Sequence, residues 1–441
     1  MRMNLVAGLT LFMGGLIASQ ANQPIVSAYY ENWSQYRPPS GGRTAFFPKN
    51  IDPTILTDLY FAFAIFGYQD KSINPQNPHL TGDYTVQPVE WNDQTLLYPQ
   101  IMSLKEINPN LRVLLSIGGW GFNDPQDPIG MNTYKLFSQM ASQQQSRAQF
   151  IQSAVKYAKQ YTFDGIDLDW EYPGDLTRGG SEADFANFIL LLSELKTACE
   201  ACNPPLLLSI ASPAIIPSGV PSQYQTNPDL YFQWIADCAE NVDRLNVMAY
   251  DYHGGFDIPM ITGVNAPLMQ DTSTLSTYCV KTTLANYLEN GVPPSKIVLG
   301  MPGYGHSYGG VSDLSPNNCS PGLRFTSLGN AGPSTATPGM LAYYEIADMI
   351  TLEELTFGID PKTQTALAYN SQTQQWVSFD TPETIASKAE YAKSLNLAGV
   401  MFWAIDDDEY AWGSKYPNIR SAYNVLYSKK IKGGGPRRLR R

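Results

Sequence analysis

Three acidic residues, Asp167, Asp169 and Glu171, follow one another at a spacing of two in the segment Asp-Gly-Ile-Asp-Leu-Asp-Trp-Glu, which begins at position 164. Alternate side chains of a β-strand lie on one face, so these three are expected to point the same way, with neighbouring acids roughly 6–7 Å apart. Carboxylates this close ionise together only at a cost, and at least one pKa should rise towards neutrality. A carboxyl group that keeps its proton can act as a general acid. The spacing alone also fits an acidic edge strand or a cation site.

Further strands are needed to hold this segment in place. Short apolar runs alternate with helical stretches along the chain, which is the pattern of repeated βα units. Helical signals cover residues 142–160 and 181–199. Eight strands of this kind predict an α/β fold, a (β/α)8 TIM barrel that spans residues 22–428. The expected strands are 25–30, 58–64, 112–118, 165–169, 206–211, 244–248, 298–301 and 399–402.

The interval between the seventh and eighth strands is too long for one helix. Residues 307–378 contain turns rich in Gly, Pro and Ser, and β-like runs at 365–369 and 375–379. We therefore expect an α+β insertion between strand 7 and helix 7, on the catalytic rim of the barrel. Thr381-Pro382-Glu383 then opens the last barrel helix.

Polar and aromatic residues gather where the expected strands end. Tyr29-Tyr30-Glu31 ends the first strand, Ser116 to Trp120 follows the third, Met248 to Asp251 follows the sixth, and Trp403 follows the eighth. The chemistry of a TIM barrel lies at the C-terminal ends of its strands. These clusters and the three acids are therefore expected to form one site.

Three motifs together resemble glycoside hydrolase family 18, the chitinases. They are the acid segment at 164–171, Ser-Ile-Gly-Gly at 116–119 and Met-Ala-Tyr-Asp at 248–251. The segment Glu90-Trp91-Asn92-Asp93 and the insertion resemble the animal-type members and their lectin relatives. The resemblance covers nearly the whole mature chain. It implies an endo-acting chitinase that cuts β-1,4 bonds between N-acetylglucosamine units in chitin or its oligosaccharides, without a cofactor.

The resemblance also implies a role for each acid. Glu171 matches the general acid, and the acetamido oxygen of the substrate replaces an enzyme nucleophile, giving an oxazolinium intermediate and retention of configuration. Asp169 matches the residue that orients the acetamido group, and Asp167 the residue that shares a proton with Asp169. Tyr250 matches the hydroxyl that holds the acetamido oxygen, and Asp251 a carboxylate beside the reacting sugar.

Trp403 matches the platform under the reacting sugar, although an aromatic plug of the barrel would look the same in sequence. Gly118 and Gly119 either let a sugar approach the backbone or form a tight turn. Trp33, Trp91 and Trp120 either stack on sugars or pack a loop. The other expected substrate-binding residues are Tyr29, Glu90, Trp91, Trp120, Gly121, Tyr172 and Met248.

Some positions depart from the family pattern. Animal relatives usually carry a disulfide between the first two strands, where this chain has Ser27 and Leu56. His306 stands where many members have Arg, and Phe256 where relatives often have Trp. These changes predict altered sugar affinities and a pH-dependent contact at His306. Asp164 is expected to support its strand, and the acid run Asp406-Asp407-Asp408-Glu409 to form a solvated cap.

The charge distribution argues against nucleic acid or an anionic membrane as the main partner. The net charge is −11, yet the last 13 residues hold seven cations and no acid, so the rest of the chain is more acidic still. The basic Gly/Arg-rich tail at 429–441 is expected to be disordered. Five cysteines leave at least one unpaired, with Cys199 and Cys202 either a local disulfide or two thiols. The three histidines and the scattered cysteines give no zinc pattern.

The N-terminus predicts export. Arg2, an apolar run at 5–17 and Ser19-Gln20-Ala21 form a signal peptide at 1–21, whose apolar run is too short to span a membrane. We expect a secreted, monomeric enzyme. Two alternatives remain open: a chitinase-like lectin on the same barrel, and an endo-β-N-acetylglucosaminidase that acts on glycans.

Overall fold

The computed structural model describes residues 23–69, 71, 73–74, 78–271, 277–413 and 415–428. Two predicted segments, the signal peptide at 1–21 and the basic tail at 429–441, lie outside these residues. In the described part of the chain, no helix combines the length and the apolar character needed to cross a membrane.

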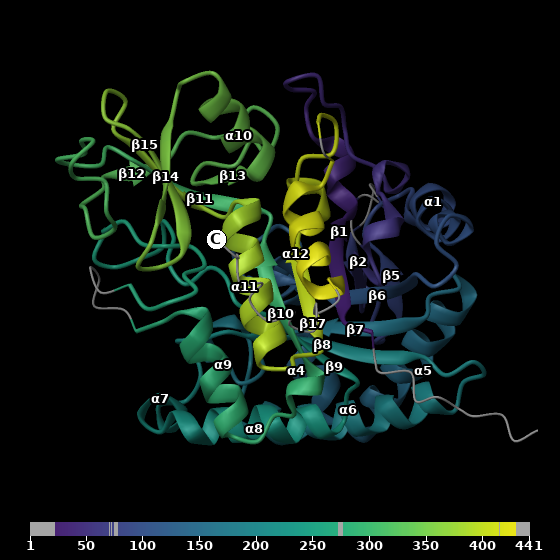
Figure 1. The fold of residues 1–441 in the computed structure, drawn as a ribbon. Helices are drawn as coiled ribbons and strands as arrows, with labels where there is room; N and C mark the ends of the chain where they lie inside the picture. Colours follow the sequence, from purple (N-terminus) through teal and green to yellow (C-terminus); the bar gives the residue numbers. More distant parts are fainter. Residues whose placement is uncertain are drawn as a thin grey trace, which may run out of the picture.

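Eight parallel strands close into a barrel (Figure 1). The barrel closes because β1 pairs with both β17 and β2. Every predicted strand is confirmed, and every end lies within two residues of its predicted position. The strands are β1 (Ile25–Glu31), β2 (Asp58–Phe66), β6 (Arg112–Gly118), β7 (Gly165–Asp169), β8 (Leu207–Pro213), β9 (Arg244–Met248), β10 (Ile297–Pro302) and β17 (Gly399–Trp403).

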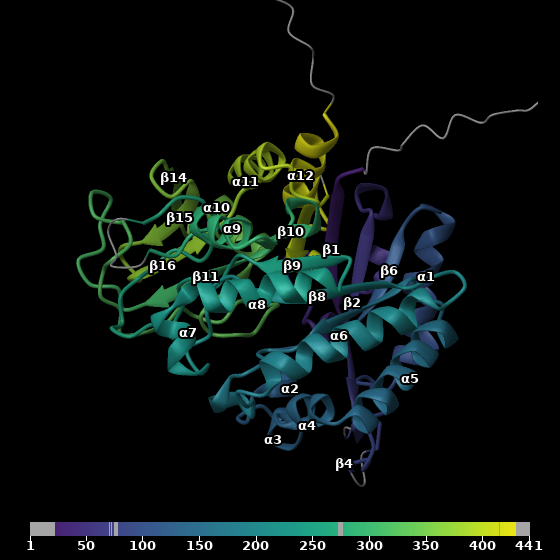
Figure 2. The ribbon, with the colours of Figure 1, turned by 90° about the horizontal axis from the view of Figure 1, so that it is seen from below.

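Helices cover the outside of the barrel, and α5, α6 and α8 lie side by side in the view from below (Figure 2). The predicted helix at 142–160 is wrong in one respect: Gln143 is extended and separates two helices. The helix predicted to open at Thr381 is confirmed as α11, and the Thr381 side chain accepts a hydrogen bond from the Thr384 N–H. It is not the last barrel helix as predicted, because α12 follows β17. The longer helices are α1 (Tyr98–Ser103), α4 (Leu136–Ser142), α5 (Gln144–Gln160), α6 (Asp184–Glu200), α8 (Pro228–Glu240), α9 (Val280–Glu289), α11 (Pro382–Ser394) and α12 (Pro417–Tyr427).

Short elements connect these units. Three of them border the site described below: η1 (Asn32–Tyr36), η6 (Leu176–Arg178) and η8 (Ile405–Asp407). The others are η2 (Pro48–Asn50), η3 (Pro53–Ile55), β3 (Tyr68–Gln69), β4 (His79–Leu80), β5 (Val86–Pro88), η4 (Asp93–Leu97), η5 (Leu104–Glu106), α2 (Trp120–Asn123), α3 (Gly130–Thr133), α7 (Ser222–Thr226) and η7 (Pro294–Lys296).

The insertion lies between β10 and α11, as predicted, and stands beside the barrel at the upper left of Figure 1. It contains an antiparallel sheet with the order β12-β11-β16-β15-β14, and β13 pairs with β11. Its own core includes Tyr308 and Trp376. Its elements are β11 (Tyr304–Gly309), β12 (Ser327–Leu328), β13 (Met340–Ala342), α10 (Tyr343–Thr351), β14 (Thr356–Asp360), β15 (Thr365–Asn370) and β16 (Gln375–Phe379).

All five cysteines are free thiols, so Cys199 and Cys202 are two thiols and form no disulfide. At the two positions where the resemblance implies a disulfide, the Ser27 hydroxyl donates to the Val400 carbonyl oxygen, and Leu56 packs into the core. Hydrogen bonding and apolar packing therefore occupy the place of the covalent link.

The prediction of a solvated acidic cap at 406–409 is wrong, because Asp406 and Asp407 are buried. The Arg37 guanidinium lies 2.8 Å from each of them and 2.9 Å from Glu31 at the end of β1. Burial raises the pKa of all three acids, that of Asp407 to about 7, and repulsion from neighbouring carboxylates adds to the rise at Asp407 and Glu31. A run of acids is normally solvated. The arginine that pairs with the acids of this run lies far away in sequence, so no local pattern indicates the pairing.

Two arginines between β1 and β2, Arg37 and Arg43, attach the insertion to the barrel. Arg37 donates to the hydroxyl of Tyr344 on α10, and the guanidinium of Arg43 lies 4.8 Å above the same ring. Arg43 also pairs with Asp348 of α10 at 2.6 Å and with Glu409 after η8. The two arginines therefore join β1, the insertion and the segment that follows β17.

We predict that Arg37→Met lowers the free energy of unfolding by about 3–5 kcal/mol at pH 8, because three buried carboxyl groups lose their shared cation. The loss should be smaller at pH 5, since a raised pKa lets these groups hold protons there. Urea unfolding at both pH values measures the effect.

Arg147→Met is the matched control for Arg37→Met. Arg147 is also buried, but it pairs with one partly exposed acid, Glu194. Equal losses for the two variants, or a loss at Arg37 that does not change with pH, would contradict the prediction.

Candidate active site

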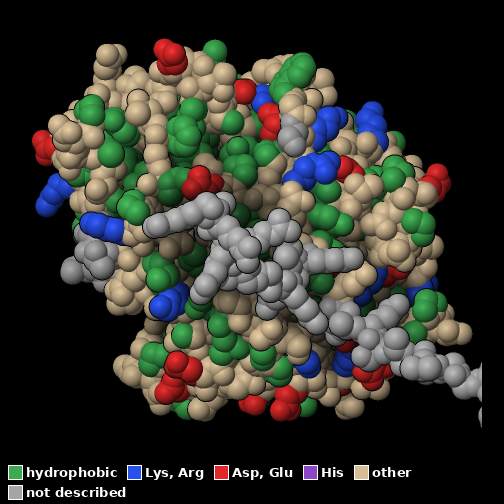
Figure 3. All heavy atoms as spheres, in the orientation of Figure 1, with side chains coloured by type: hydrophobic (Ala, Val, Ile, Leu, Met, Phe, Trp, Pro, Cys, Tyr) green, Lys and Arg blue, Asp and Glu red, His purple; other side chains and the backbone are tan. Residues whose placement is uncertain are grey.

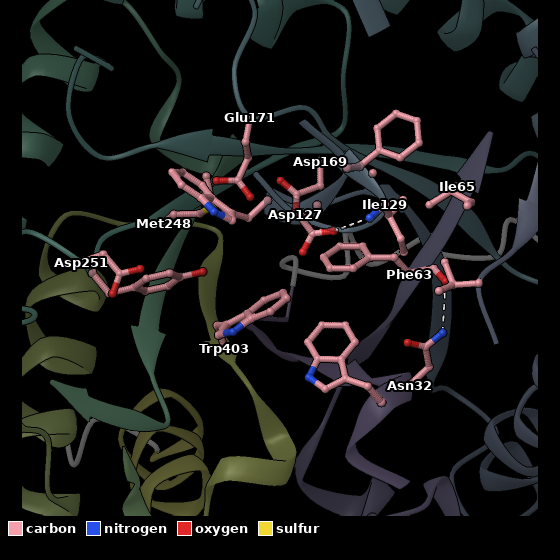
Figure 4. Close-up of a pocket in the computed structure, with 18 of the residues that line it drawn as sticks. Asn32, Phe63, Ile65, Asp127, Ile129, Asp169, Glu171, Met248, Asp251 and Trp403 are labelled. Atoms are coloured by element: carbon pink, nitrogen blue, oxygen red, sulfur yellow. Dashed lines mark hydrogen bonds between the residues drawn. The ribbon is translucent and has the colours of Figure 1, made fainter. Parts of the chain in front are cut away.

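The strand that carries the acids, β7, alternates between two environments as expected. Asp167 faces the barrel interior, and Asp169 and Glu171 reach a cavity at its C-terminal end (Figure 4). Asp164 supports the strand by accepting hydrogen bonds from the Lys105 ammonium and a backbone N–H. The apolar members of the segment pack into the helical layer; they are Ile166, Leu168 and Trp170.

A cavity of about 410 Å³ opens where the barrel strands end. In Figure 4, Asp169 and Glu171 lie on one wall and Trp403 lies opposite them. Hydrophobic side chains also reach the surface between the insertion and the barrel (Figure 3). The predicted site residues that line the cavity are Gly118, Gly119, Trp120, Gly121, Asp169, Glu171, Met248, Tyr250, Asp251 and Trp403.

The turn after β6 needs glycine. Gly118 and Gly119 have φ angles of 118° and 93°, which side-chain-bearing residues rarely adopt. A Cβ atom on Gly118 would lie 2.2 Å from the backbone oxygen of Asp169, and one on Gly119 would lie 2.6 Å from the Phe63 ring. The two glycines therefore form a tight turn and also keep this wall of the cavity open.

The carboxylate of Asp167 accepts hydrogen bonds from side chains of four different strands. Tyr29 and Ser116 donate to one oxygen at 2.8 and 2.7 Å. Ser209 and Asn246 donate to the other at 2.6 and 3.3 Å. Burial raises the pKa of Asp167, and these four donors oppose that rise by stabilising the charged form.

Asp169 has the opposite environment. Among the described residues, its buried Oδ1 has no hydrogen-bond partner. Burial, together with the charges of Glu171 and Asp167, raises the pKa of Asp169 well above its usual range. Burial also raises the pKa of Glu171 to about 7, although Tyr172 and Arg178 favour its charged form. The three acids Asp167, Asp169 and Glu171, called the acid ladder below, therefore retain at least one proton near neutral pH, as the spacing predicts.

Arg178, which the sequence argument missed, holds the loop that follows the acids. Its side chain donates to the backbone oxygens of Glu171 and Trp120 at 2.7 and 2.6 Å. The guanidinium also lies 3.5 Å from the centre of the Trp120 ring. One cation therefore positions both an acid and an aromatic wall of the cavity. No spacing rule connects position 178 with position 171.

Asp251 joins the barrel to the insertion at the edge of the cavity. Its Oδ1 accepts a hydrogen bond from the Tyr304 hydroxyl and lies 2.7 Å from Nε2 of His306. The Nδ1 atom of His306 faces the Gly339 carbonyl oxygen at 3.3 Å. An imidazole with an acceptor at each nitrogen is best satisfied when both nitrogens carry protons. Burial lowers the pKa of His306, but Asp251, the Gly339 carbonyl oxygen and Asp257 together raise it further, so the net shift is upward.

The wall opposite the acids is aromatic. The Trp403 ring lies 5.7 Å from Phe63, 6.3 Å from Trp33 and 5.2 Å from Tyr29, measured between ring centres. Trp403 lines the cavity and is only partly buried, so it is a wall residue and does not plug the barrel. Sugars present apolar C–H faces to surfaces of this kind.

Some predicted site residues lie outside the cavity lining. Tyr29 is buried beneath the cavity, where it donates to Asp167. Tyr172 interacts with the Glu171 carboxyl group. Glu90 accepts a hydrogen bond from Tyr36, and Trp91 is exposed. Tyr29 and Tyr172 lie near predicted strand ends, whereas Glu90 and Trp91 are expected here only from the family resemblance.

The sequence argument also missed three residues that meet the predicted ones. Ser209 and Asn246 contact Asp167, and Tyr304 contacts Asp251. Ser209 and Asn246 could have been predicted from the sequence, because both occupy inward-facing positions of predicted strands. Within the described ranges, no cluster of three His, Cys, Asp or Glu side chains could hold a metal ion.

Comparison with known sequences decides the family. The sequence profile of Glycosyl hydrolases family 18 matches residues 25–408. The chain belongs to this family. Family 18 relatives include mouse Chitotriosidase-1, which is 32% identical over 413 residues covering 90% of this chain and 77% of the relative. Human Chitinase-3-like protein 2 is 31% identical over 407 residues, covering 91% and 92% of the two chains.

Solved family 18 structures include enzymes and non-enzymes. Group IV chitinase of Ostrinia furnacalis, solved in complex with allosamidin, is 31% identical with a TM-score of 0.75 and covers 92% of this chain and 99% of its own. Human YKL-39, described as a pseudo-chitinase with retained chitooligosaccharide binding, is 28% identical with a TM-score of 0.73 and covers 92% and 100%. The fold alone therefore does not separate hydrolysis from sugar binding.

We predict that Glu171→Gln makes the protein more stable at pH 8, by about 2 kcal/mol, and changes it little at pH 4. A carboxyl group whose pKa is raised by folding favours the folded state only while it is protonated, and this contribution disappears as the pH rises through about 7. Thermal unfolding at both pH values measures the difference. A gain at pH 8 no larger than that of the exposed control Glu106→Gln would contradict it.

Proposed function

We propose that this protein is a secreted endo-acting chitinase that hydrolyses β-1,4 linkages between N-acetylglucosamine units with retention of configuration. The observation that carries the proposal is Glu171, whose carboxyl group borders the cavity and whose raised pKa keeps a proton available near neutral pH. Cleavage of a glycosidic bond needs such a proton donor. The chitinases among the relatives support the choice of substrate.

In the proposed mechanism Glu171 protonates the glycosidic oxygen while the bond from C1 to that oxygen breaks. The acetamido oxygen of the sugar at subsite −1, on the non-reducing side of the bond, attacks C1 and forms an oxazolinium ion. The ionised Glu171 then takes a proton from water, which opens the ring from the face that the leaving group occupied. Two inversions at C1 give net retention, and Glu171 regains its proton.

Other side chains around the cavity would stabilise the positive charge. The unpartnered Oδ1 of Asp169 is available to accept the acetamido N–H, which would orient the amide and stabilise the cation. The buried hydroxyl of Tyr250 lines the same cavity and would donate to the acetamido oxygen. Asp167 would supply a second negative charge below Asp169, and Asp251 a polar contact at the insertion side.

The aromatic walls support binding of more than one sugar. Trp403 would lie under the sugar at −1, with Phe63 packed against it. Trp33 and Trp120 both line the cavity and keep 39% and 53% of their surface exposed. Rings that remain accessible beyond the acids favour an endo-acting enzyme, because a chain can continue past the cleavage point.

Two rival functions predict different outcomes. A lectin on this fold would bind chitooligosaccharides without cleaving them, which is how human YKL-39 is described. An endo-β-N-acetylglucosaminidase would release glycans from glycoproteins and would leave N-acetylchitohexaose intact.

We predict that wild type cleaves N-acetylchitohexaose to β-anomers and that Glu171→Gln loses at least about 10³-fold in turnover, because the proton donor is gone. Binding of the hexamer should remain within a few-fold. Chromatography that separates anomers and calorimetric titration measure the two quantities. Intact hexamer with wild type, or equal turnover by the variant, would refute the proposal.

The acetamido step has its own control, which is a hexamer built from glucosamine alone. This substrate lacks the attacking oxygen and should resist cleavage, and Asp169→Asn should be severely impaired on the acetylated one. Efficient cleavage of the glucosamine hexamer would exclude the oxazolinium route. Release of α-anomers would exclude it as well.

We predict that kcat/KM falls above a pKa of about 7, because the general acid must be protonated in the free enzyme. A profile of kcat/KM between pH 4 and 9 measures this limb. His306→Gln is the control, since the His306 pKa is also raised and could give a similar limb. The assignment to Glu171 requires the limb to persist in that variant, and its disappearance would assign it to His306.

Export and the monomeric state are parts of the proposal that rest on the sequence alone. The signal peptide at 1–21 lies outside the described residues. Mass determination of the mature protein from a culture medium tests the export, and gel filtration tests the oligomeric state.

A further inference from the structure

A column of buried polar side chains runs along the barrel interior beneath the acids. Arg244 and Asn246 occupy inward positions of β9, two residues apart, and Met248 at the end of the strand lines the cavity. Tyr60 of β2 lies beside them and is fully buried, as is Asn246. Polar groups in such a place need partners, because burial without a hydrogen bond is costly.

Asn246 is the central member of the column. Its Nδ2 donates to the Tyr29 hydroxyl at 3.0 Å and to Oδ1 of Asp167 at 3.3 Å. Its Oδ1 accepts from the Tyr60 hydroxyl at 3.3 Å. The Tyr60 ring stacks on Tyr29, with ring centres 4.6 Å apart. These contacts fix the orientation of the amide, with its donor side towards Asp167.

A cation closes the lower end of the column. Arg244 pairs with Asp58 at 2.8 Å, and Arg112 pairs with the same carboxylate, so the base carries one net positive charge. Burial raises the pKa of Tyr60, and the charge of Arg244 opposes part of that rise. The Asn246 amide therefore donates to Asp167 on one side, and the positively charged Arg244 lies at the other end of the column.

Ser209 of β8 completes the arrangement from the neighbouring strand, donating to Oδ1 of Asp167 at 2.6 Å. Asp169, one step higher on the ladder, has an oxygen without any partner among the described residues. A proton shared among these acids is held less readily by the carboxylate that accepts four hydrogen bonds.

We propose that Asn246 and Ser209 are positioning residues that keep Asp167 ionised, so that the exchangeable proton stays with Asp169 and Glu171. This inference rests on the proposed function, in which Glu171 donates that proton. Asn246 and Ser209 would not touch the substrate and would act only through Asp167.

Two serines of β8 provide a matched test. Ser209→Ala removes a donor to Asp167, whereas Ser212→Ala removes an equally buried hydroxyl that meets Tyr287 outside the barrel. Asn246→Leu and Asn123→Leu form a second pair, because the Asn123 side chain donates to the backbone oxygen of Tyr134 and to no carboxylate.

We predict that Ser209→Ala and Asn246→Leu lower kcat on N-acetylchitohexaose about 10- to 100-fold with KM changed less than about two-fold. The acid limb of kcat/KM should move up by roughly one pH unit, since Asp167 then binds a proton more readily. Ser212→Ala and Asn123→Leu should leave both limbs in place, and Ser209→Thr should restore the wild-type limb. An acid limb that stays in place in Ser209→Ala and Asn246→Leu would overturn the inference.

A second measurement separates this inference from the proposed function. The loss of melting temperature in Ser209→Ala should be greater at pH 8 than at pH 4, because the missing donor matters most when Asp167 is ionised. Ser212→Ala should show no such dependence. This comparison needs no turnover, so it remains decisive if wild type binds sugar without cleaving it. Equal pH dependence in the two variants would overturn the role of Ser209.

Discussion

The carboxylate of Asp167 sets the central constraint of this structure. An ionised carboxyl group at the axis of a barrel is tolerated only if hydrogen bonds replace the water that it loses. Tyr29, Ser116, Ser209 and Asn246 supply those bonds from four strands. All four donors converge only when the sheet is closed and the strands are in register, with Asp167 opposite Ser116 and Ser209. The hydrogen bonds of this buried carboxyl group thus tie the geometry of the site to closure of the barrel.

The number of hydrogen bonds that each carboxyl group accepts differs between Asp167, Asp169 and Glu171. Each oxygen of Asp167 accepts two hydrogen bonds, while Oδ1 of Asp169 has no partner in the part of the chain that the structure describes. Glu171 lies between these extremes, with Tyr172 and Arg178 favouring its charge and burial opposing it. Three acids of similar intrinsic strength therefore differ in their affinity for a proton. That difference is what allows neighbouring carboxyl groups to take separate roles in one reaction.

The insertion completes the site from the other side. It contributes Tyr304 and His306, which hold Asp251 at the edge of the cavity. Its position depends on Arg37 and Arg43, which bind α10 and the segment after β17 at the same time. Because that segment follows Trp403 directly, the attachment of the insertion and the placement of the aromatic wall share one set of ion pairs.

The sequence by itself determined the eight strands, the inserted domain and the direction of the acids, because the alternation of apolar and polar side chains is a local property of each strand. It also indicated that at least one of the closely spaced acids would have a raised pKa, since their spacing follows from strand geometry. Tertiary structure alone decided which strand ends meet and which side chains reach the cavity. Tyr29 and Trp91 were both expected to bind substrate, yet Tyr29 is buried under Asp167 and Trp91 is exposed.

Contacts between distant segments account for the remaining differences. The run at 406–409 has the composition of a solvated cap, yet its first two acids are buried and paired with Arg37, which lies far away in sequence. The contacts of Arg178, Ser209 and Asn246 likewise depend on neighbours that only the fold brings close. Local periodicity fixes where a side chain points along its own strand. The charge and hydrogen-bond partners that it meets there depend on closure of the barrel, and these set its proton affinity.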